Sequence, residues 1–150
     1  TLNESSWAES PQRFEAGTPN LEGVYGLSIA VDYIQKIGMK NISFHDKKLM
    51  NYTIEKLKKI SGLTLYGSKS SENRIGIISF NIGTLHAHDV AEFLGSKGII
   101  VRAGHMCCQP LMKRLGISSC IRVSFYLYNT LEDVDTLCYA LEECGRFFKI

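Results

Sequence analysis

The stretch IIVRAGHMCCQPLMKRLGISSCIRVSFY, residues 99–126, decides the fold because its pattern changes from strand to loop to helix and back to strand. Residues 99–103 are mostly apolar and β-branched, which predicts a strand. A loop is expected over residues 104–110, and the apolar spacing of residues 111–115 predicts a short helix. A second strand is predicted near residues 121–126. This order is typical of an α/β or α+β domain in which helices cover a small sheet.

Two helices are predicted ahead of this stretch. Apolar residues over 27–34 recur at helical spacing, and Gly38 is placed to end that helix. Ser43, followed three residues later by Asp46, forms a capping-box pattern that predicts the start of a second helix. The expected buried stripe of this second helix is made of Leu49, Met50, Thr53, Ile54, Leu57 and Ile60.

A pair of neighbouring strands and one more helix are predicted between these helices and the stretch. Residues 63–66 and 74–82 are rich in residues that favour strands, and the polar sequence SKSSEN, residues 68–73, separates them. Apolar spacing predicts a helix over residues 88–97.

The two ends of the chain differ in their patterning. Residues 1–20 are polar and interrupted by proline and glycine, so we expect a leading segment there and a single small domain over residues 21–150. Thr130, with Asp133 as its capping partner, predicts the start of a long last helix.

The composition is that of a globular protein and argues against several functional classes. Hydrophobic residues make up 45% of the 150 residues, charged residues 21%, and the formal net charge is +2. This balance argues against disorder, and no concentration of lysine and arginine predicts nucleic-acid binding. The longest apolar stretch, residues 75–80, is far shorter than the roughly 18 residues that a membrane helix needs.

The five cysteines indicate the chemical environment of the protein. Cys107 and Cys108 are adjacent and the chain has no paired CxxC motif, which is typical of neither a disulfide framework nor a zinc site. The first residues also lack the order of a signal peptide. We therefore expect no metal site and a reducing compartment, the cytoplasm, with an organelle matrix as the alternative.

The loop over residues 104–110 holds the densest group of polar side chains, which includes His105, Cys107 and Cys108. A thiolate is a nucleophile, and a nearby arginine or histidine and a following helix would raise the reactive fraction of such a thiol. The alternative is that both cysteines are small packed hydrophobic residues, as free cysteines often are.

Two arginines flank this loop on the predicted strands. Alternation along a strand places Arg102 on the face opposite Val101, and Arg122 on the face opposite Ile121 and Val123. Two such arginines could hold a carboxylate through bidentate hydrogen bonds. Pairing of each arginine with a structural aspartate or glutamate is the alternative.

Two further motifs have competing interpretations. Gly17 and Thr18, in FEAGTPN at residues 14–20, offer a backbone N–H and a hydroxyl to a phosphate, or form a turn before a helix. His86 and His88 stand two apart at a helix start, where a structural cap or a surface pair competes with a zinc site.

Three motifs together resemble a known family: RFEAGTPN at 13–20, RAGHMCCQP at 102–110 and RVSFYLYNT at 122–130. They are similar to the C-terminal part of the group II, SufS-type cysteine desulfurases of the class V aminotransferase superfamily. The resemblance covers nearly the whole chain and implies the small C-terminal domain of a fold-type I transferase that depends on pyridoxal 5'-phosphate (PLP). Such enzymes are homodimers that convert L-cysteine to L-alanine, hold the sulfur as an enzyme persulfide and pass it to an acceptor protein for iron–sulfur cluster assembly.

The resemblance implies a role for each residue that matches a family motif. The nucleophilic cysteine of the family stands where Cys107 is, and its substrate-binding arginines stand where Arg102 and Arg122 are. Gly17 and Thr18 match the pair that reaches the cofactor phosphate of the opposite subunit.

The chain also departs from the family pattern R-x-G-H-H-C. Met106 stands in place of the second histidine, and Cys108 stands where alanine is usual, which supplies a competing thiol. His88 resembles a histidine of those members that deliver sulfur to a zinc-containing acceptor protein.

The lysine that forms a Schiff base with PLP is expected outside this chain. The family supplies that lysine from a Ser-x-His-Lys segment of the large domain, and none of the lysines here has that context. We therefore expect a desulfurase as the whole protein and no activity from this chain alone. The alternatives are a selenocysteine lyase, or a persulfide carrier or dimerisation domain without catalysis of its own.

Overall fold

The protein is described by a computed structural model over residues 3–68 and 74–149. The chain divides into two compact units between Met39 and Lys40. The predicted boundary between a leading segment, residues 1–20, and a small domain, residues 21–150, stays a prediction. The polar loop predicted over residues 68–73 lies outside the described residues except for its first position. Within the described ranges, no helix is long and apolar enough to cross a membrane.

The first unit contains a short 3-10 helix and a long α-helix. The 3-10 helix η1 covers Gln12–Phe14, and helix α1 covers Leu21–Ile37. The side chain of Asn20 caps α1 by accepting a hydrogen bond from the backbone N–H of Gly23 at 2.9 Å. Gly38 follows the last helical residue with a φ of 88°, which confirms the predicted end of this helix.

Helix α2 covers Met39–Leu57, so the predicted start at Ser43 is wrong. The chain turns at Gly38 and is helical from the next residue, which leaves Ser43 and Asp46 inside the helix and not at a cap. The predicted buried stripe is confirmed, because the structure buries Leu49, Met50, Thr53, Ile54, Leu57 and Ile60.

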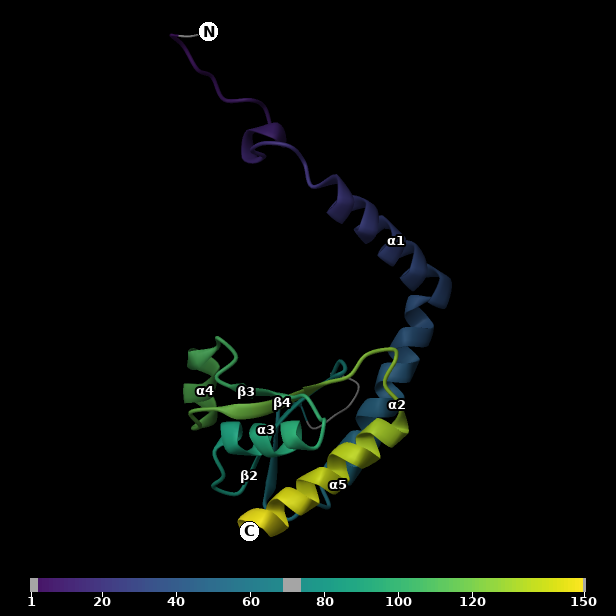
Figure 1. The fold of residues 1–150 in the computed structure, drawn as a ribbon, viewed down its shortest axis with the longest axis vertical. Helices are drawn as coiled ribbons and strands as arrows, with labels where there is room; N and C mark the ends of the chain where they lie inside the picture. The colour runs from purple at the N-terminus through teal and green to yellow at the C-terminus, as the bar shows by residue number, and fades with distance from the viewer. Residues whose placement is uncertain (1–2, 69–73, 150) are drawn as a thin grey trace. The chain divides into compact units, whose positions relative to one another are not determined.

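The second unit contains a four-stranded antiparallel sheet in the order β1-β2-β4-β3. Figure 1 labels strands β2, β3 and β4 of this sheet. The strands are β1 Leu63–Tyr66, β2 Ile77–Ile82, β3 Arg102–Gly104 and β4 Cys120–Ser124. Strands β1 and β2 are neighbours as predicted, and β4 confirms the strand expected near residues 121–126, although it ends earlier.

Three further helices belong to the second unit: α3 Ala87–Ser96, α4 Gln109–Leu115 and α5 Leu131–Phe148. Thr130 caps α5 as predicted: its hydroxyl accepts a hydrogen bond from the Asp133 N–H, and the Asp133 carboxylate accepts one from the Thr130 N–H. Helix α4 already begins inside the predicted loop, because Pro in the first helical turn has no N–H that must find a partner.

Two strands start later than predicted because nearby turns use their backbone groups. The N–H of Ile99 bonds to the carbonyl of Leu94 at the end of α3, so β3 begins only at Arg102. The N–H of Ile77 bonds to the carbonyl of Ile75 at 2.5 Å, and this tight turn ends where β2 begins.

One face of the sheet forms the core. Inward-facing residues of β2 and β4 are buried together with residues of α2, α3 and α5, among them Ile78, Phe80, Ile82, Ile121 and Val123. The predicted fold class, a small sheet covered by helices, is confirmed. The residues that alternate with these on β2 and β4 lie on the opposite face, which positions the site.

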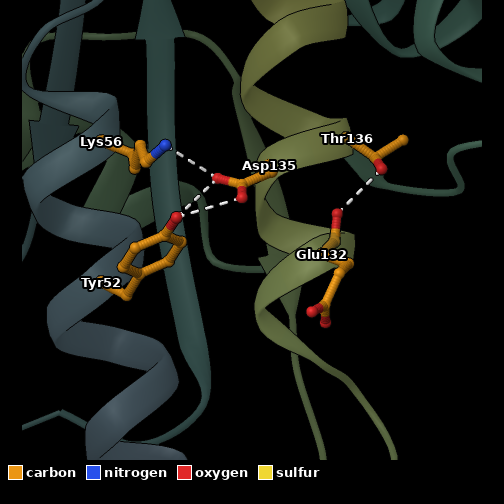
Figure 2. Close-up of polar contacts among 5 residues, drawn as sticks. All are labelled: Tyr52, Lys56, Glu132, Asp135 and Thr136. Atoms are coloured by element: carbon orange, nitrogen blue, oxygen red, sulfur yellow. Dashed lines mark hydrogen bonds and ion pairs between the residues drawn. The ribbon is translucent and has the colours of Figure 1, made fainter.

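A polar contact joins α2 to α5, which run beside each other in the second unit (Figures 1 and 2). Lys56 Nζ lies 2.9 Å from a carboxylate oxygen of Asp135, and the Tyr52 hydroxyl donates to the same carboxylate at 2.8 Å. This contact lowers the pKa of Asp135, first through its hydrogen bond with Lys56 and then through that with Tyr52.

Candidate active site

Arg102 and Arg122 are register partners on the neighbouring strands β3 and β4. Residues directly opposite each other in an antiparallel pair share one face of the sheet, so the structure brings the two predicted arginines together. Arg122 is half-buried, and its Nε atom is buried without a hydrogen-bond partner among the described residues. No ion pair of either arginine with an aspartate or glutamate is present in the described part of the chain.

Like charges that face each other across strands destabilise a sheet, and a buried guanidinium N–H without a partner costs further free energy. An anion bound at this face would offset both costs. The arrangement therefore favours the interpretation of the two arginines as an anion site over that of structural ion pairs.

An open pocket of about 450 Å³ lies at this face of the sheet. Arg122 lines it together with Ser79, its register partner on β2, and with the buried Cys120. Met106 and Cys108 line the pocket from the loop that precedes α4, while Cys107 is not among the lining residues.

The loop between β3 and α4 is a tight turn with a strained backbone. The N–H of Cys108 bonds to the carbonyl of His105 at 2.9 Å, and the two central residues, Met106 and Cys107, have φ of 56° and 57°. Positive φ at a residue other than glycine costs on the order of 1 kcal/mol. The N–H of Cys107 also donates to His105 Nδ1 at 3.1 Å. The loop places its two cysteines differently: Cys108 lines the pocket, whereas Cys107 is exposed and is not among the lining residues.

The thiol of Cys120 differs from these two in its burial. Burial raises the pKa of Cys120, while its hydrogen bond with Ser79 and the charge of Arg122 partly oppose the increase. Cys120 therefore stays a neutral thiol in the wall of the pocket. The interpretation as packed hydrophobic residues fails for Cys107 and Cys108, because both are exposed.

The two histidines take different places near this loop. His86 caps α3, and its Nδ1 accepts the N–H of His88 at 3.4 Å, as in the structural interpretation of this pair. A Cβ atom at Gly104, which has a φ of 122°, would lie 3.8 Å from His88 Nε2. His88 therefore lies near the end of β3, where the loop between β3 and α4, here called the cysteine loop, begins. Among the described residues, no group of three possible ligands could hold a metal ion.

Gly17 and Thr18 lie in the first unit, and both are exposed. Gly17 has a φ of 77°, and a Cβ atom there would meet no other atom within 4 Å. This exposure is compatible with both interpretations, a phosphate contact and a turn ahead of α1.

The sequence patterns did not identify Ser79, Asn81 or Cys120 as parts of this face. Ser79 and Asn81 alternate with the buried residues of β2, and this alternation was the available signal. Asn81 donates to the carbonyl of Ser119 at 2.9 Å, which fastens the loop ahead of β4.

Comparison with known proteins places the chain in one family. Residues 1–137 match the aminotransferase class-V family. A probable cysteine desulfurase of Staphylococcus epidermidis (strain ATCC 12228 / FDA PCI 1200) is 48% identical over 145 residues, which are 97% of this chain and 35% of that protein. A probable cysteine desulfurase of Halalkalibacterium halodurans is 45% identical over 98% of this chain and 36% of its own length. The chain thus spans about a third of the length of these curated relatives.

The fold is similar to that of a solved cysteine desulfurase. The apo structure of cysteine desulfurase from Thermococcus onnurineus NA1 matches 97% of this chain and 36% of its own chain, with 41% identity and a TM-score of 0.91.

Proposed function

This chain belongs to the class-V aminotransferase family, and we propose that it is the C-terminal part of a group II, SufS-type cysteine desulfurase. The whole protein would convert L-cysteine to L-alanine and hold the sulfur as a cysteine persulfide for iron–sulfur cluster assembly. Its place would be a reducing compartment, the cytoplasm.

The observation that carries the proposal is the pairing of Arg102 with Arg122, because Arg122 lines a pocket that Cys108 also lines. In the proposed site, the guanidinium of Arg122, whose buried Nε has no partner among the described residues, receives the substrate carboxylate, and Arg102 adds a second positive charge. The sulfur of the bound cysteine then lies within reach of the loop that carries the nucleophile.

Cys107 is the proposed nucleophile. Its thiolate attacks the sulfur of the bound cysteine, an S–S bond forms, and the C–S bond breaks with its electron pair leaving on the alanine portion. In the described conformation Cys107 is exposed and does not line the pocket, so a movement of the loop would bring its thiol to the substrate. The positive φ at Met106 and Cys107 supplies backbone strain that such a movement would release.

The proposed cofactor is PLP, which when bound supplies an electron sink for the reaction. Gly17 and Thr18 would bind its phosphate in the opposite subunit of a homodimer, and their exposure suits that role. The anchoring lysine would come from the large domain, so this chain alone would be inactive. His88, beside the start of the cysteine loop, would assist sulfur transfer to a zinc-containing acceptor protein.

The experiment compares Arg122→Lys with Arg114→Lys in the full-length enzyme. Arg114 is an exposed arginine of α4 that does not line the pocket, so it serves as the matched control. Lysine cannot reproduce the bidentate bonds of arginine, so Arg122→Lys should lower kcat/KM for L-cysteine by about tenfold or more while the protein stays folded. Unchanged alanine release by Arg122→Lys would reject the carboxylate role. Equal rates with L-selenocysteine would favour the selenocysteine lyase alternative.

A further inference from the structure

Three cysteine thiols lie on or near the cysteine loop, and they differ in their access to the pocket. Cys107 is exposed but does not line the pocket, whereas Cys120 lines the pocket but is only 2% exposed. Cys108 is both exposed and part of the pocket lining. Among these three, Cys108 alone can therefore receive a group from solvent-facing Cys107 and hold it in the pocket.

We propose that Cys108 is a second sulfur-carrying site, which takes the outer sulfur atom of a Cys107 persulfide and holds it in the pocket beside Arg122. The inference rests on the proposed function, which supplies the persulfide on Cys107.

The transfer needs no oxidant or reductant. The Cys108 thiolate attacks the outer sulfur of the Cys107 persulfide, a new S–S bond forms on Cys108, and the old S–S bond breaks. Cys107 leaves as a thiolate and is free for another turnover. The number of disulfide-type bonds is one before and one after the step, so no net oxidation occurs.

The two cysteines are neighbouring residues of one tight turn, which limits how far apart their sulfur atoms can lie. The two residues are adjacent, so their Cα atoms are about 3.8 Å apart. A persulfide extends the Cys107 side chain by an S–S bond of about 2 Å. The tight turn closed by the Cys108 N–H and the His105 carbonyl keeps both cysteines at the same end of the loop.

The pocket is suited to holding a sulfur atom. Met106 of the loop and Leu111 and Met112 of α4 line it with apolar side chains, against which a sulfur atom can pack. The Arg122 guanidinium lines the same pocket and has a buried Nε without a partner, so it would stabilise a persulfide anion. Cys107 does not line this pocket in the described conformation.

The experiment supplies sulfur from inorganic tetrasulfide, which does not depend on desulfurase activity. The full-length protein is treated with one equivalent of tetrasulfide, freed of excess reagent, and trapped with iodoacetamide at successive times. Tandem mass spectrometry of the tryptic peptide over residues 103–113 then locates the extra sulfur on Cys107 or Cys108. We expect the sulfur to appear first on Cys107 and to move to Cys108 while the total stays constant.

Two variants distinguish transfer from direct loading. In Cys108→Ser the sulfur should stay on Cys107, and in Cys107→Ser the initial loading of Cys108 should fall by about threefold or more, because the neighbouring donor is gone. Sulfur that stays on Cys107 in the unaltered protein, or equally fast loading of Cys108 in Cys107→Ser, would overturn the proposal. If the Cys107 variant does not fold, the time course of the unaltered protein decides alone.

A parallel reaction with L-cysteine as the sulfur source separates this inference from the proposed function. If tetrasulfide sulfur moves from Cys107 to Cys108 but L-cysteine supplies no sulfur to either residue, the proposed desulfurase function is rejected and the proposal of a second sulfur-carrying site stands. Sulfur from L-cysteine that never leaves Cys107 would reject the second site alone.

Discussion

Arg102 and Arg122 face each other across strands β3 and β4 as register partners, with two positive charges on one face of the sheet. Such a pair lowers the stability of an empty site, which is typical of positions that a protein keeps for binding an anion.

Removing one charge should therefore stabilise the chain. We expect Arg102→Gln to raise the free energy of unfolding by about 0.2–1 kcal/mol at low ionic strength, since the repulsion between the strands is lost. Added salt should reduce the gain because Arg102 is exposed and its charge is screened. Urea unfolding at low and high salt measures the effect, with Arg114→Gln as a control that should show little change. Destabilisation by Arg102→Gln at low salt would contradict the account.

The capping box of α5 should contribute more to the free energy of unfolding than a threonine within the same helix does. Thr130→Ala removes the hydroxyl that accepts the Asp133 N–H, so we expect a loss of about 1 kcal/mol in urea unfolding. Thr136→Ala is the matched control, because Thr136 is exposed within the same helix and its hydroxyl donates to the Glu132 carbonyl (Figure 2). The control should change stability by a few tenths of a kcal/mol, in either direction. Equal effects at the two threonines would exclude a capping contribution.

The contact between α2 and α5 should make stability depend on pH in acid. The pKa of Asp135 is held below its ordinary value of 3.8, so its contribution is full above that value. It is lost as the pH falls through the lower pKa of the folded state. We expect Asp135→Asn to be destabilised at neutral pH and to show less loss of stability in acid than the unaltered chain. Glu142→Gln, which alters an exposed carboxylate of the same helix, should keep the original acid dependence.

The isolated chain should not attach PLP covalently. None of its lysines stands in the Ser-x-His-Lys context of the family. After borohydride treatment in the presence of PLP, we therefore expect no single lysine to carry the reduced cofactor in stoichiometric amount. Peptide mapping by mass spectrometry measures this. Stoichiometric reduction of PLP onto one lysine would show that the chain carries its own anchor.

The sequence predicted those elements whose ends are set by local signals. The Thr130–Asp133 cap and the positive φ at Gly38 involve residues close in the chain, and both were found where expected. The start of α2 was predicted wrongly, because the pattern at Ser43 resembles a helix cap but lies inside a helix that begins at Met39. Strand β3 begins later than predicted because the N–H of Ile99 bonds to a carbonyl of α3. Local composition does not decide whether such a residue continues a turn or joins a strand.

The candidate site could be predicted only in part for a related reason. Alternation placed each arginine on a face of its strand, but the register that opposes Arg102 and Arg122 depends on how β3 and β4 pair. The pairing of β2 with β4 brings Ser79 beside Arg122, although the two residues are far apart in the sequence. Which thiol faces the pocket depends on the backbone of Met106 and Cys107, whose positive φ the residue types do not favour.

The most direct test of the proposed desulfurase is the location of sulfur after turnover of the full-length enzyme with L-cysteine. We expect the tryptic peptide over residues 103–113 to gain one sulfur atom while L-alanine is released. Cys107→Ala should abolish this gain, and Cys108→Ala should keep most of it because the nucleophile is intact. A gain that persists in Cys107→Ala and is lost in Cys108→Ala, or an unmodified peptide in the unaltered enzyme, would contradict the account.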